Sequence, residues 1–182
     1  MKNALTDDLD LIKGCLANDR NSQRILYNKY APKMLAVCMR YSTSKDEAED
    51  VMIEGFMKVF TSLESFAYKS SLEVWIRSIM THCAINSYRK NQKFRFAETI
   101  EEMAEEPDAQ AWNSIPDSIS EKEILLAIQK MPPYLQAVLN LIAFDGYSYE
   151  EVSQELEISQ VTVRTRLFRA KKWLLDYIDS EH

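Results

Sequence analysis

The stretch YSYEEVSQELEISQVTVRTRLFRAKKWL, residues 147–174, carries the clearest structural signal in this sequence. Ser148 and Glu151 have the spacing of a capping box, so they predict the start of a short helix. After a tight turn, Ser159 predicts the start of a second, longer helix. A short helix, a turn and a longer basic helix are the pattern of a helix-turn-helix, whose second helix enters the major groove of DNA.

The side chains of the longer helix separate onto two faces. An apolar stripe that we expect to face the core recurs at steps of three and four: Val163, Leu167, Ala170, Leu174 and Tyr177. Another face carries Thr162, Thr165, Arg166 and Arg169, with Arg164 and Lys171 on its flank. Arginine can pair bidentately with guanine, and threonine suits a phosphate or a thymine methyl. A solvated basic helix is the alternative, but the cap, the turn and the two faces together favour duplex DNA.

The net charge of −6 by itself argues against a nucleic-acid partner. Its distribution along the chain reverses that argument, because residues 1–96 sum to +4, residues 97–123 to −8 and residues 124–182 to −2. Two windows, residues 74–97 and 158–175, contain five basic residues each and no acidic residue. The net value therefore conceals two basic segments separated by an acidic one.

Composition excludes several classes of protein. The chain has 182 residues, of which 46% are hydrophobic, so it can bury real cores. No stretch approaches the roughly 20 apolar residues of a membrane span, and acidic residues near the N-terminus replace the apolar core of a signal peptide. We therefore expect a cytoplasmic protein with no membrane insertion.

The cysteine and histidine residues do not form a pattern typical of catalysis or metal binding. Cys15, Cys38 and Cys83 lie within apolar helical patterns, which favours buried free thiols over a redox role. His82 and His182 lack metal-ligand spacing with each other or with a cysteine. No nucleophile–base pair is visible, so we expect no metal, no cofactor and no enzymatic activity.

Helical periodicity dominates the whole chain and predicts an all-α fold of two small helical domains joined by a flexible acidic linker. The expected boundaries are residues 5–96 for a four-helix domain, 97–117 for the linker and 118–180 for the helix-turn-helix domain. Further predicted helix starts are the pairs Ser44–Glu47, Ser70–Glu73 and Ser118–Glu121, and the proline pair Pro132-Pro133. The linker is rich in Glu and Asp and has no basic residue, so it is either an exposed spacer or a specific binding segment.

Aromatic residues lie among basic residues in the first basic segment, residues 74–97, and just before it. The aromatic set is Phe66, Tyr68, Trp75, Tyr88, Phe94 and Phe96, and the basic set is Arg77, Arg89, Lys90, Lys93 and Arg95. Bases of a single strand stack on aromatic rings beside a positive groove. Core packing is the alternative for Trp75 and Tyr88. One segment suited to duplex and one suited to unpaired strand indicate a protein that binds and opens DNA.

Four runs resemble the extracytoplasmic-function (group 4) sigma factors of the sigma-70 family, the promoter-specificity subunits of bacterial RNA polymerase. These runs are DEAEDVMIEGFMKVF at 46–60, SLEVWIRSIMTHCAINSYRKNQK at 71–93, MPPYLQAVLNL at 131–141, and the helix-turn-helix stretch at 147–174. The resemblance covers nearly the whole chain. Their order and spacing carry it, because a helix-turn-helix alone is common to many families.

The resemblance implies a sigma factor that binds RNA polymerase core, directs it to specific promoters and assists DNA melting at initiation. Its partners would be the β′ clamp and β flap of the core, promoter DNA both duplex and unpaired, and as a candidate an anti-sigma factor. The implied core-binding residues are Glu49, Asp50 and Glu54. The implied minus-10 residues are Phe66, Tyr68, Lys69, Trp75, His82, Asn86, Arg89 and Lys90. The implied minus-35 residues are Gln160, Thr162, Arg164, Thr165, Arg166 and Arg169.

Several positions depart from the family's usual residues. Ile53 and Gly55 stand where the core-binding helix often has Gln and Thr, and Val161 stands where a small residue is usual. His82 and Asn86 replace a frequent Asn and Asp in the minus-10 segment. Two rival classes remain open: a transcription regulator that binds duplex DNA without polymerase, and an all-α interaction protein with an incidental basic helix.

Overall fold

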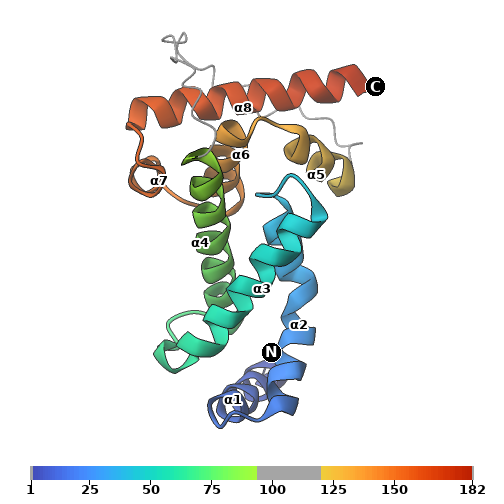
Figure 1. Ribbon diagram of the computed structural model, residues 1–182, viewed down its shortest axis with the longest axis vertical. Coiled ribbons are helices and arrows are strands. Elements are labelled where there is room, and N and C mark those ends of the chain that lie inside the picture. Colours follow the sequence, from blue (N-terminus) through green and yellow to red (C-terminus); the bar gives the residue numbers. More distant parts are fainter. Residues whose placement is uncertain (1, 94–119, 182) are drawn as a thin grey trace. The chain divides into compact units, whose positions relative to one another are not determined.

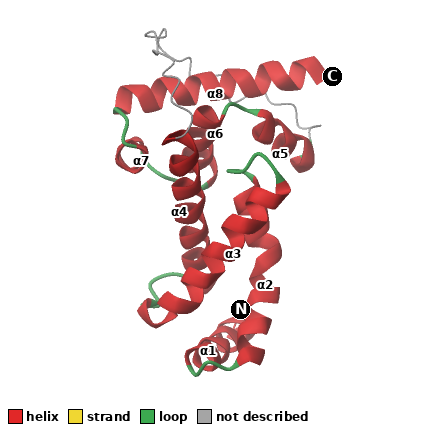
Figure 2. Ribbon diagram, in the orientation of Figure 1, coloured by secondary structure: helices red, strands yellow, loops and turns green. Residues whose placement is uncertain are grey.

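The computed structural model describes residues 2–93 and 120–181. Every regular element in these two segments is helical, which confirms the expected all-α class (Figures 1 and 2). The elements are α1 (Lys2–Leu16), α2 (Arg20–Met39), α3 (Lys45–Ser62), the 3₁₀ turn η1 (Leu63–Ser65), α4 (Leu72–Lys93), α5 (Glu121–Lys130), α6 (Pro133–Leu139), the π-helical turn η3 (Asn140–Phe144), α7 (Tyr149–Leu156) and α8 (Gln160–Glu181).

The described residues form two compact units. The first contains α1, α2, α3, η1 and α4 as far as Ala84, and the second contains the short segment Arg40–Thr43, the end of α4 from Ile85, and α5 to α8. The predicted linker, residues 97–117, lies outside the described residues. The domain boundaries given above therefore stay a prediction, and each unit is described by itself.

The first unit is built around α2, which packs against both α1 and α3. Its core is a set of side chains at most 5% exposed: Ile12, Leu26, Met34, Val51, Phe56, Val59, Ile76 and Met80. Gly55 brings α3 close to α4, because a Cβ atom at this position would lie 2.2 Å from the Sδ atom of Met80. Burial of this apolar set stabilises the unit by the hydrophobic effect.

The helix starts in this unit follow the predicted chemistry with one shift. The Ser44 side chain accepts the backbone N–H of Glu47 at 3.2 Å, as expected for the start of α3. At α4 the cap is Ser71, which accepts the backbone N–H of Val74 at 3.3 Å, so the prediction of Ser70 was one residue early. Two adjacent serines offered two registers for the cap, and the helix uses the second.

In the second unit α8 packs against α5, α6 and α7 (Figure 1). The α5 capping box is Ser120–Glu123, two residues later than the predicted Ser118–Glu121. Pro133 occupies the first position of α6, as predicted, where its missing N–H costs nothing. The buried Gln136 side chain donates through Nε2 to the carbonyl of Ile128 at 2.9 Å, which ties α6 to the last turn of α5.

The apolar stripe of α8 is nearly the predicted one. Val163, Leu167, Ala170 and Leu174 are buried, but the fifth buried side chain is Ile178. Tyr177 is half-buried and stacks on Trp173, with ring centroids 5.2 Å apart. At 100° per residue, Tyr177 and Ile178 lie about equally far from the centre of the stripe on opposite sides, so helical spacing alone does not choose between them.

Candidate nucleic-acid interface

The turn between α7 and α8 is fixed by backbone and side-chain hydrogen bonds. Glu157 has a left-handed backbone (φ 56°), and its N–H donates to the carbonyl of Ser153, which ends α7. The Ser153 hydroxyl donates to the carbonyl of Ile158 at 2.6 Å. Ser159 then accepts the backbone N–H of Thr162 at 3.0 Å and starts α8. These contacts confirm the predicted helix-turn-helix.

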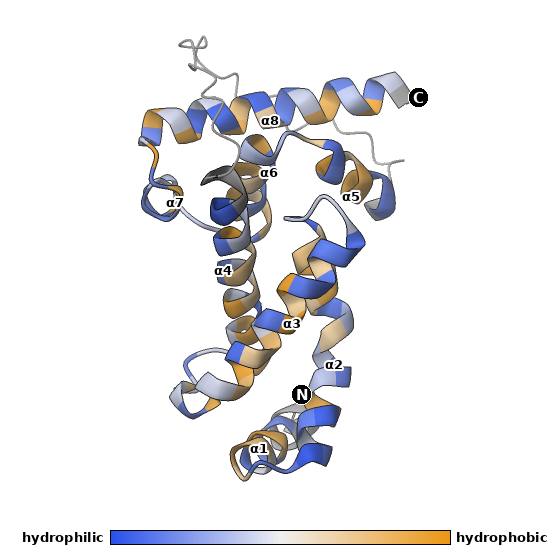
Figure 3. Ribbon diagram, in the orientation of Figure 1, coloured by the Kyte–Doolittle hydropathy of each residue, from blue (hydrophilic) through white to orange (hydrophobic). Residues whose placement is uncertain are grey.

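The face of α8 opposite the core is polar, basic and partly apolar, and Figure 3 shows hydrophilic and hydrophobic residues alternating along the helix. At 100° per residue, the side chains opposite the buried stripe between residues 160 and 175 are Val161, Thr165, Phe168, Arg169 and Lys172. Among the predicted minus-35 residues, Thr165 and Arg169 lie near the centre of this face, Thr162 lies at its edge, and Arg164 lies on a flank. Gln160 is exposed at the first position of α8, but its direction is that of the buried stripe.

Two minus-35 candidates, Arg166 and Thr162, make contacts within the unit. Arg166 lies on the flank of α8 that faces α6, where its guanidinium is 5.4 Å from the ring centroid of Tyr134. Thr162 is half-buried, and its hydroxyl lies 2.8 Å from that of Ser159 in the helix cap. Both are therefore more involved in the fold of the unit than the sequence pattern indicates.

Sequence reasoning missed three residues at this surface. Tyr149 supports Arg164, whose guanidinium is 5.7 Å from the tyrosine ring centroid, within the range of a cation–π contact. Val161 was singled out only as a departure from the family's usual residue, and Phe168 was not a candidate, yet both lie on the outward face. A helical wheel centred on the buried stripe would have found the last two, whereas the Tyr149 contact requires the tertiary fold.

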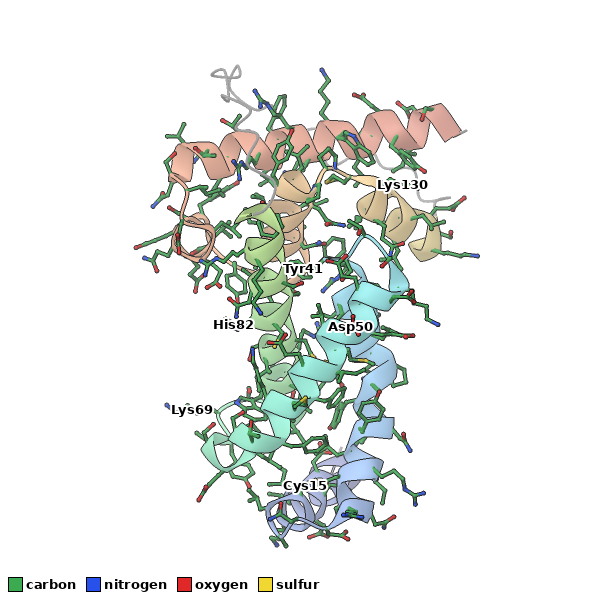
Figure 4. The ribbon with its side chains drawn as sticks, in the orientation of Figure 1. Cys15, Tyr41, Asp50, Lys69, His82 and Lys130 are labelled. Atoms are coloured by element: carbon green, nitrogen blue, oxygen red, sulfur yellow. The ribbon has the colours of Figure 1, made fainter. Side chains whose placement is uncertain are left out.

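The loop after η1 presents an aromatic cluster. Phe66 is buried, with its ring centroid 4.7 Å from that of Tyr68 and 5.3 Å from that of Trp75. Tyr68 is 58% exposed and has a left-handed backbone (φ 58°) that turns it outward. Lys69 follows in the same exposed loop (Figure 4). Phe66 therefore supports the cluster from beneath, and Tyr68 offers its ring to solvent.

A polar face runs along α4 from the aromatic cluster. His82 and Asn86 are exposed and four residues apart, so they share one face of the helix (Figure 4). The Nδ1–H of His82 donates to the carbonyl of Ser78 at 2.6 Å, which leaves Nε2 directed away from the backbone. Arg89 is half-buried and Lys90 is exposed on the following turn. The helix thus carries five of the eight predicted minus-10 residues, Trp75, His82, Asn86, Arg89 and Lys90, and the other three lie in the loop before it.

The outer face of α3 mixes carboxylates with exposed apolar side chains. Glu49 pairs with Lys45 at 3.3 Å and Glu54 with Lys58 at 2.8 Å. Asp50 is exposed on the same helix (Figure 4). Two exposed apolar side chains lie among them, since Ile53 is 52% and Met57 is 65% exposed, and the sequence analysis singled out only Ile53. An acidic surface with an apolar centre is typical of a protein-binding face.

The remaining chemistry is sparse within the described segments. Cys15, Cys38 and Cys83 are buried free thiols, and burial raises the pKa of Cys15 and of Cys83. No group of three His, Cys, Asp or Glu side chains in residues 2–93 and 120–181 is arranged to hold a metal ion. No helix in these segments is long and apolar enough to cross a membrane.

Comparison with known proteins matches both parts of the chain. The family model "Sigma-70 region 2" matches residues 26–94, and "Sigma-70, region 4" matches residues 121–174. The ECF RNA polymerase sigma-E factor of Haemophilus influenzae is 28% identical over 184 residues, covering 96% of each chain. The longer ECF RNA polymerase sigma factor SigE of Mycolicibacterium smegmatis is 27% identical over 157 residues, covering 84% of this chain and 60% of its own.

The fold has a counterpart among solved structures. The sigma factor RpoE of Bartonella quintana, solved in complex with the anti-sigma factor NepR, aligns with a TM-score of 0.52 at 21% identity. The alignment covers 87% of this chain and 98% of that chain. Fold, helix-turn-helix and both family regions define a sigma-70 family transcription initiation factor. Within that family the chain belongs to the extracytoplasmic-function sigma factors, which direct RNA polymerase to promoters.

Proposed function

We propose that this sigma factor divides promoter recognition among three surfaces: the outer face of α8, the aromatic cluster with the polar face of α4, and the outer face of α3. They would bind the minus-35 duplex, the opened minus-10 strand and RNA polymerase core, respectively. The observation that carries the proposal is the outer face of α8. Thr165 and Arg169 lie on this face, opposite the buried apolar stripe and C-terminal to the first turn, which Ser159 caps.

The minus-35 assignment rests on shape and charge. A single helix fits the major groove, and residues near its N-terminus reach base edges. Gln160, Arg164 and Thr165 occupy the first two turns of α8, and no acidic residue occurs between residues 158 and 175. Arg169 lies one turn further along, where it can reach a base or the phosphate backbone.

The minus-10 assignment rests on stacking beside positive charge. Extruding a base costs a few kcal/mol, so a site that captures it must supply stacking and hydrogen bonds. Tyr68 offers an exposed ring backed by Phe66 and Trp75, and Lys69 supplies an adjacent charge. His82 and Asn86 with Arg89 and Lys90 would continue the contact along α4.

The core-binding assignment rests on the mixed chemistry of α3. Glu49, Asp50 and Glu54 would contact basic groups of the β′ clamp, while the exposed Ile53 and Met57 would supply apolar contact area. The ion pairs of Glu49 and Glu54 with lysines on the same helix are exposed, so exchanging them for partner contacts costs little.

The remaining assignments follow from the same role. We propose residues 5–96 and 118–180 as the two functional domains, 97–117 as the linker, and the β flap as a contact of the second domain. The protein would act in the cytoplasm and direct an enzyme without being one. The Bartonella protein was solved with an anti-sigma factor, so such a regulator is a proposed partner that co-purification from the native host would test.

The test is a reconstitution with core polymerase in which each surface is changed separately. Asp50→Lys should weaken core association, Arg169→Ala should weaken minus-35 binding, and His82→Ala with Asn86→Ala should slow open-complex formation. Two matched controls on other exposed positions, Asp10→Lys on α1 and Lys130→Ala on α5, should leave all three steps unchanged.

The three readouts separate the candidate classes. If Asp50→Lys leaves core affinity intact, the assignment of α3 is wrong. Sequence-specific duplex binding without any core association would favour the regulator that acts without polymerase. Binding to core polymerase combined with no effect of α8 variants on promoter choice would favour an interaction protein with an incidental basic helix.

A further inference from the structure

Val161 is an apolar residue in a position that the fold does not require to be apolar. It is the second residue of α8, opposite the buried stripe, and 63% of its side chain is exposed. Val163, two residues on, is fully buried. A single exposed valine is ordinary on a protein surface. What distinguishes this one is its place on the first turn of the helix that is proposed to enter the major groove.

The chemistry of the groove limits what this side chain can contact favourably. Val161 presents two methyl groups and no donor or acceptor, so hydrogen bonding to base edges is left to its neighbours. Among the groups that the four base pairs present in the major groove, the C5-methyl of thymine is apolar, and the others are hydrogen-bond donors or acceptors. Placing the valine against a donor or acceptor would desolvate it without a partner, which is unfavourable.

Charged neighbours hold the surrounding surface against DNA. Arg164 lies three residues further along the helix, supported by the ring of Tyr149, and Lys172 is exposed further along the same helix. These cations match the phosphates that flank the groove. We propose that Val161 is a specificity-determining residue that selects a thymine in the minus-35 element through its 5-methyl group. This inference rests on the proposed function of α8.

The experiment removes apolar groups from each partner in turn: the 5-methyl group of a thymine, and the two γ-methyl groups of Val161. Holoenzyme reconstituted from the full chain and core polymerase is used to select minus-35 sequences from a randomised duplex. In the selected duplex each thymine is then replaced singly by deoxyuracil, which lacks only the methyl. Affinities are compared for wild type, Val161→Ala and the matched control Val74→Ala, an exposed valine on α4 that is 54% accessible.

The expected result is one thymine at which deoxyuracil weakens wild-type binding about fourfold, the value for one buried methylene-sized group. Val161→Ala should weaken binding to the thymine duplex and lose the difference between thymine and deoxyuracil there. Val74→Ala should keep the wild-type ratio. Circular dichroism of Val161→Ala should match wild type, because the side chain contributes little to the core.

Three outcomes would overturn the inference. If deoxyuracil leaves the affinity unchanged at every thymine, or if the selected element contains no thymine, the protein does not recognise a thymine methyl group. A thymine preference that persists in Val161→Ala would assign the contact to another side chain such as Thr165 or Phe168. In both cases sequence-specific binding still supports the proposed role of α8. Failure to enrich any minus-35 sequence would instead remove that role as well.

Discussion

Removing the hydroxyl of Ser159 should loosen the first turn of α8 and weaken DNA binding by a comparable amount. This hydroxyl accepts the backbone N–H of Thr162 at 3.0 Å and lies 2.8 Å from the Thr162 hydroxyl. Ser159 is exposed, so Ser159→Ala creates no cavity and the loss is that of the cap. Replacing an N-cap serine by alanine costs about 1 kcal/mol, which is about fivefold in the local opening equilibrium.

Two measurements test this prediction. Amide hydrogen exchange should speed up at least fivefold at Thr162, which loses its acceptor in Ser159→Ala, and about fivefold at Val163, whose N–H donates to the Ser159 carbonyl and is exposed when the turn frays. Affinity of the holoenzyme for a minus-35 duplex should fall by at most the same factor, because DNA binds the helical form of the turn. Ser159→Asn should preserve both properties, because asparagine caps as well as serine.

A second cap provides the control. Ser44→Ala removes an equivalent bond at the start of α3, where the hydroxyl accepts the N–H of Glu47 at 3.2 Å. It should destabilise the first unit without changing minus-35 affinity. The reasoning would be refuted if Ser159→Ala and Ser159→Asn gave the same exchange rates, or if Ser44→Ala weakened minus-35 binding equally.

Three further predictions concern packing, arginine positioning and pH. Gly55→Ala should lower the free energy of unfolding in urea, because overpacking against Met80 costs about 1–3 kcal/mol and exceeds a helix-propensity gain of about 1 kcal/mol; in a Met80→Ala background it should be neutral or stabilising. Tyr149→Leu should weaken minus-35 binding about two- to fivefold while Tyr149→Phe should not, and the loss should vanish in an Arg164→Ala background. Hydrogen bonds from Ser148 lower the pKa of Glu151, so the ionised carboxylate stabilises the fold at neutral pH, and this stabilisation is lost as pH falls below the ordinary value of 4.5. In acid-unfolding experiments, the free energy of unfolding of Glu151→Gln should therefore fall less than that of wild type over this pH range.

Sequence reasoning succeeded where local chemistry decides the structure. The caps at Ser44, Ser148 and Ser159 depend on residues three positions apart, so their spacing alone identifies them. It failed by one or two residues at α4 and α5, where neighbouring serines allow more than one register and the surrounding packing selects among them.

The parts of the site that could not be predicted depend on tertiary contacts. The support of Arg164 by Tyr149 joins two helices across the turn, and the approach of Gly55 to Met80 joins α3 to α4. Neither contact has a spacing signature. The sequence also did not distinguish Phe66 from Tyr68. In the structure the Phe66 ring is buried beneath the cluster, and the Tyr68 ring is exposed to solvent.

One chain is proposed to make polymerase hold a minus-35 duplex and open the minus-10 segment together. A footprint of the reconstituted holoenzyme on its selected promoter, combined with permanganate modification of unpaired thymines, measures both events on the same DNA. We expect an upstream protected duplex and reactive thymines downstream of it, both present only when the chain is added to core polymerase. Protection of duplex without any reactive thymine, or the same pattern with core alone, would contradict this proposal.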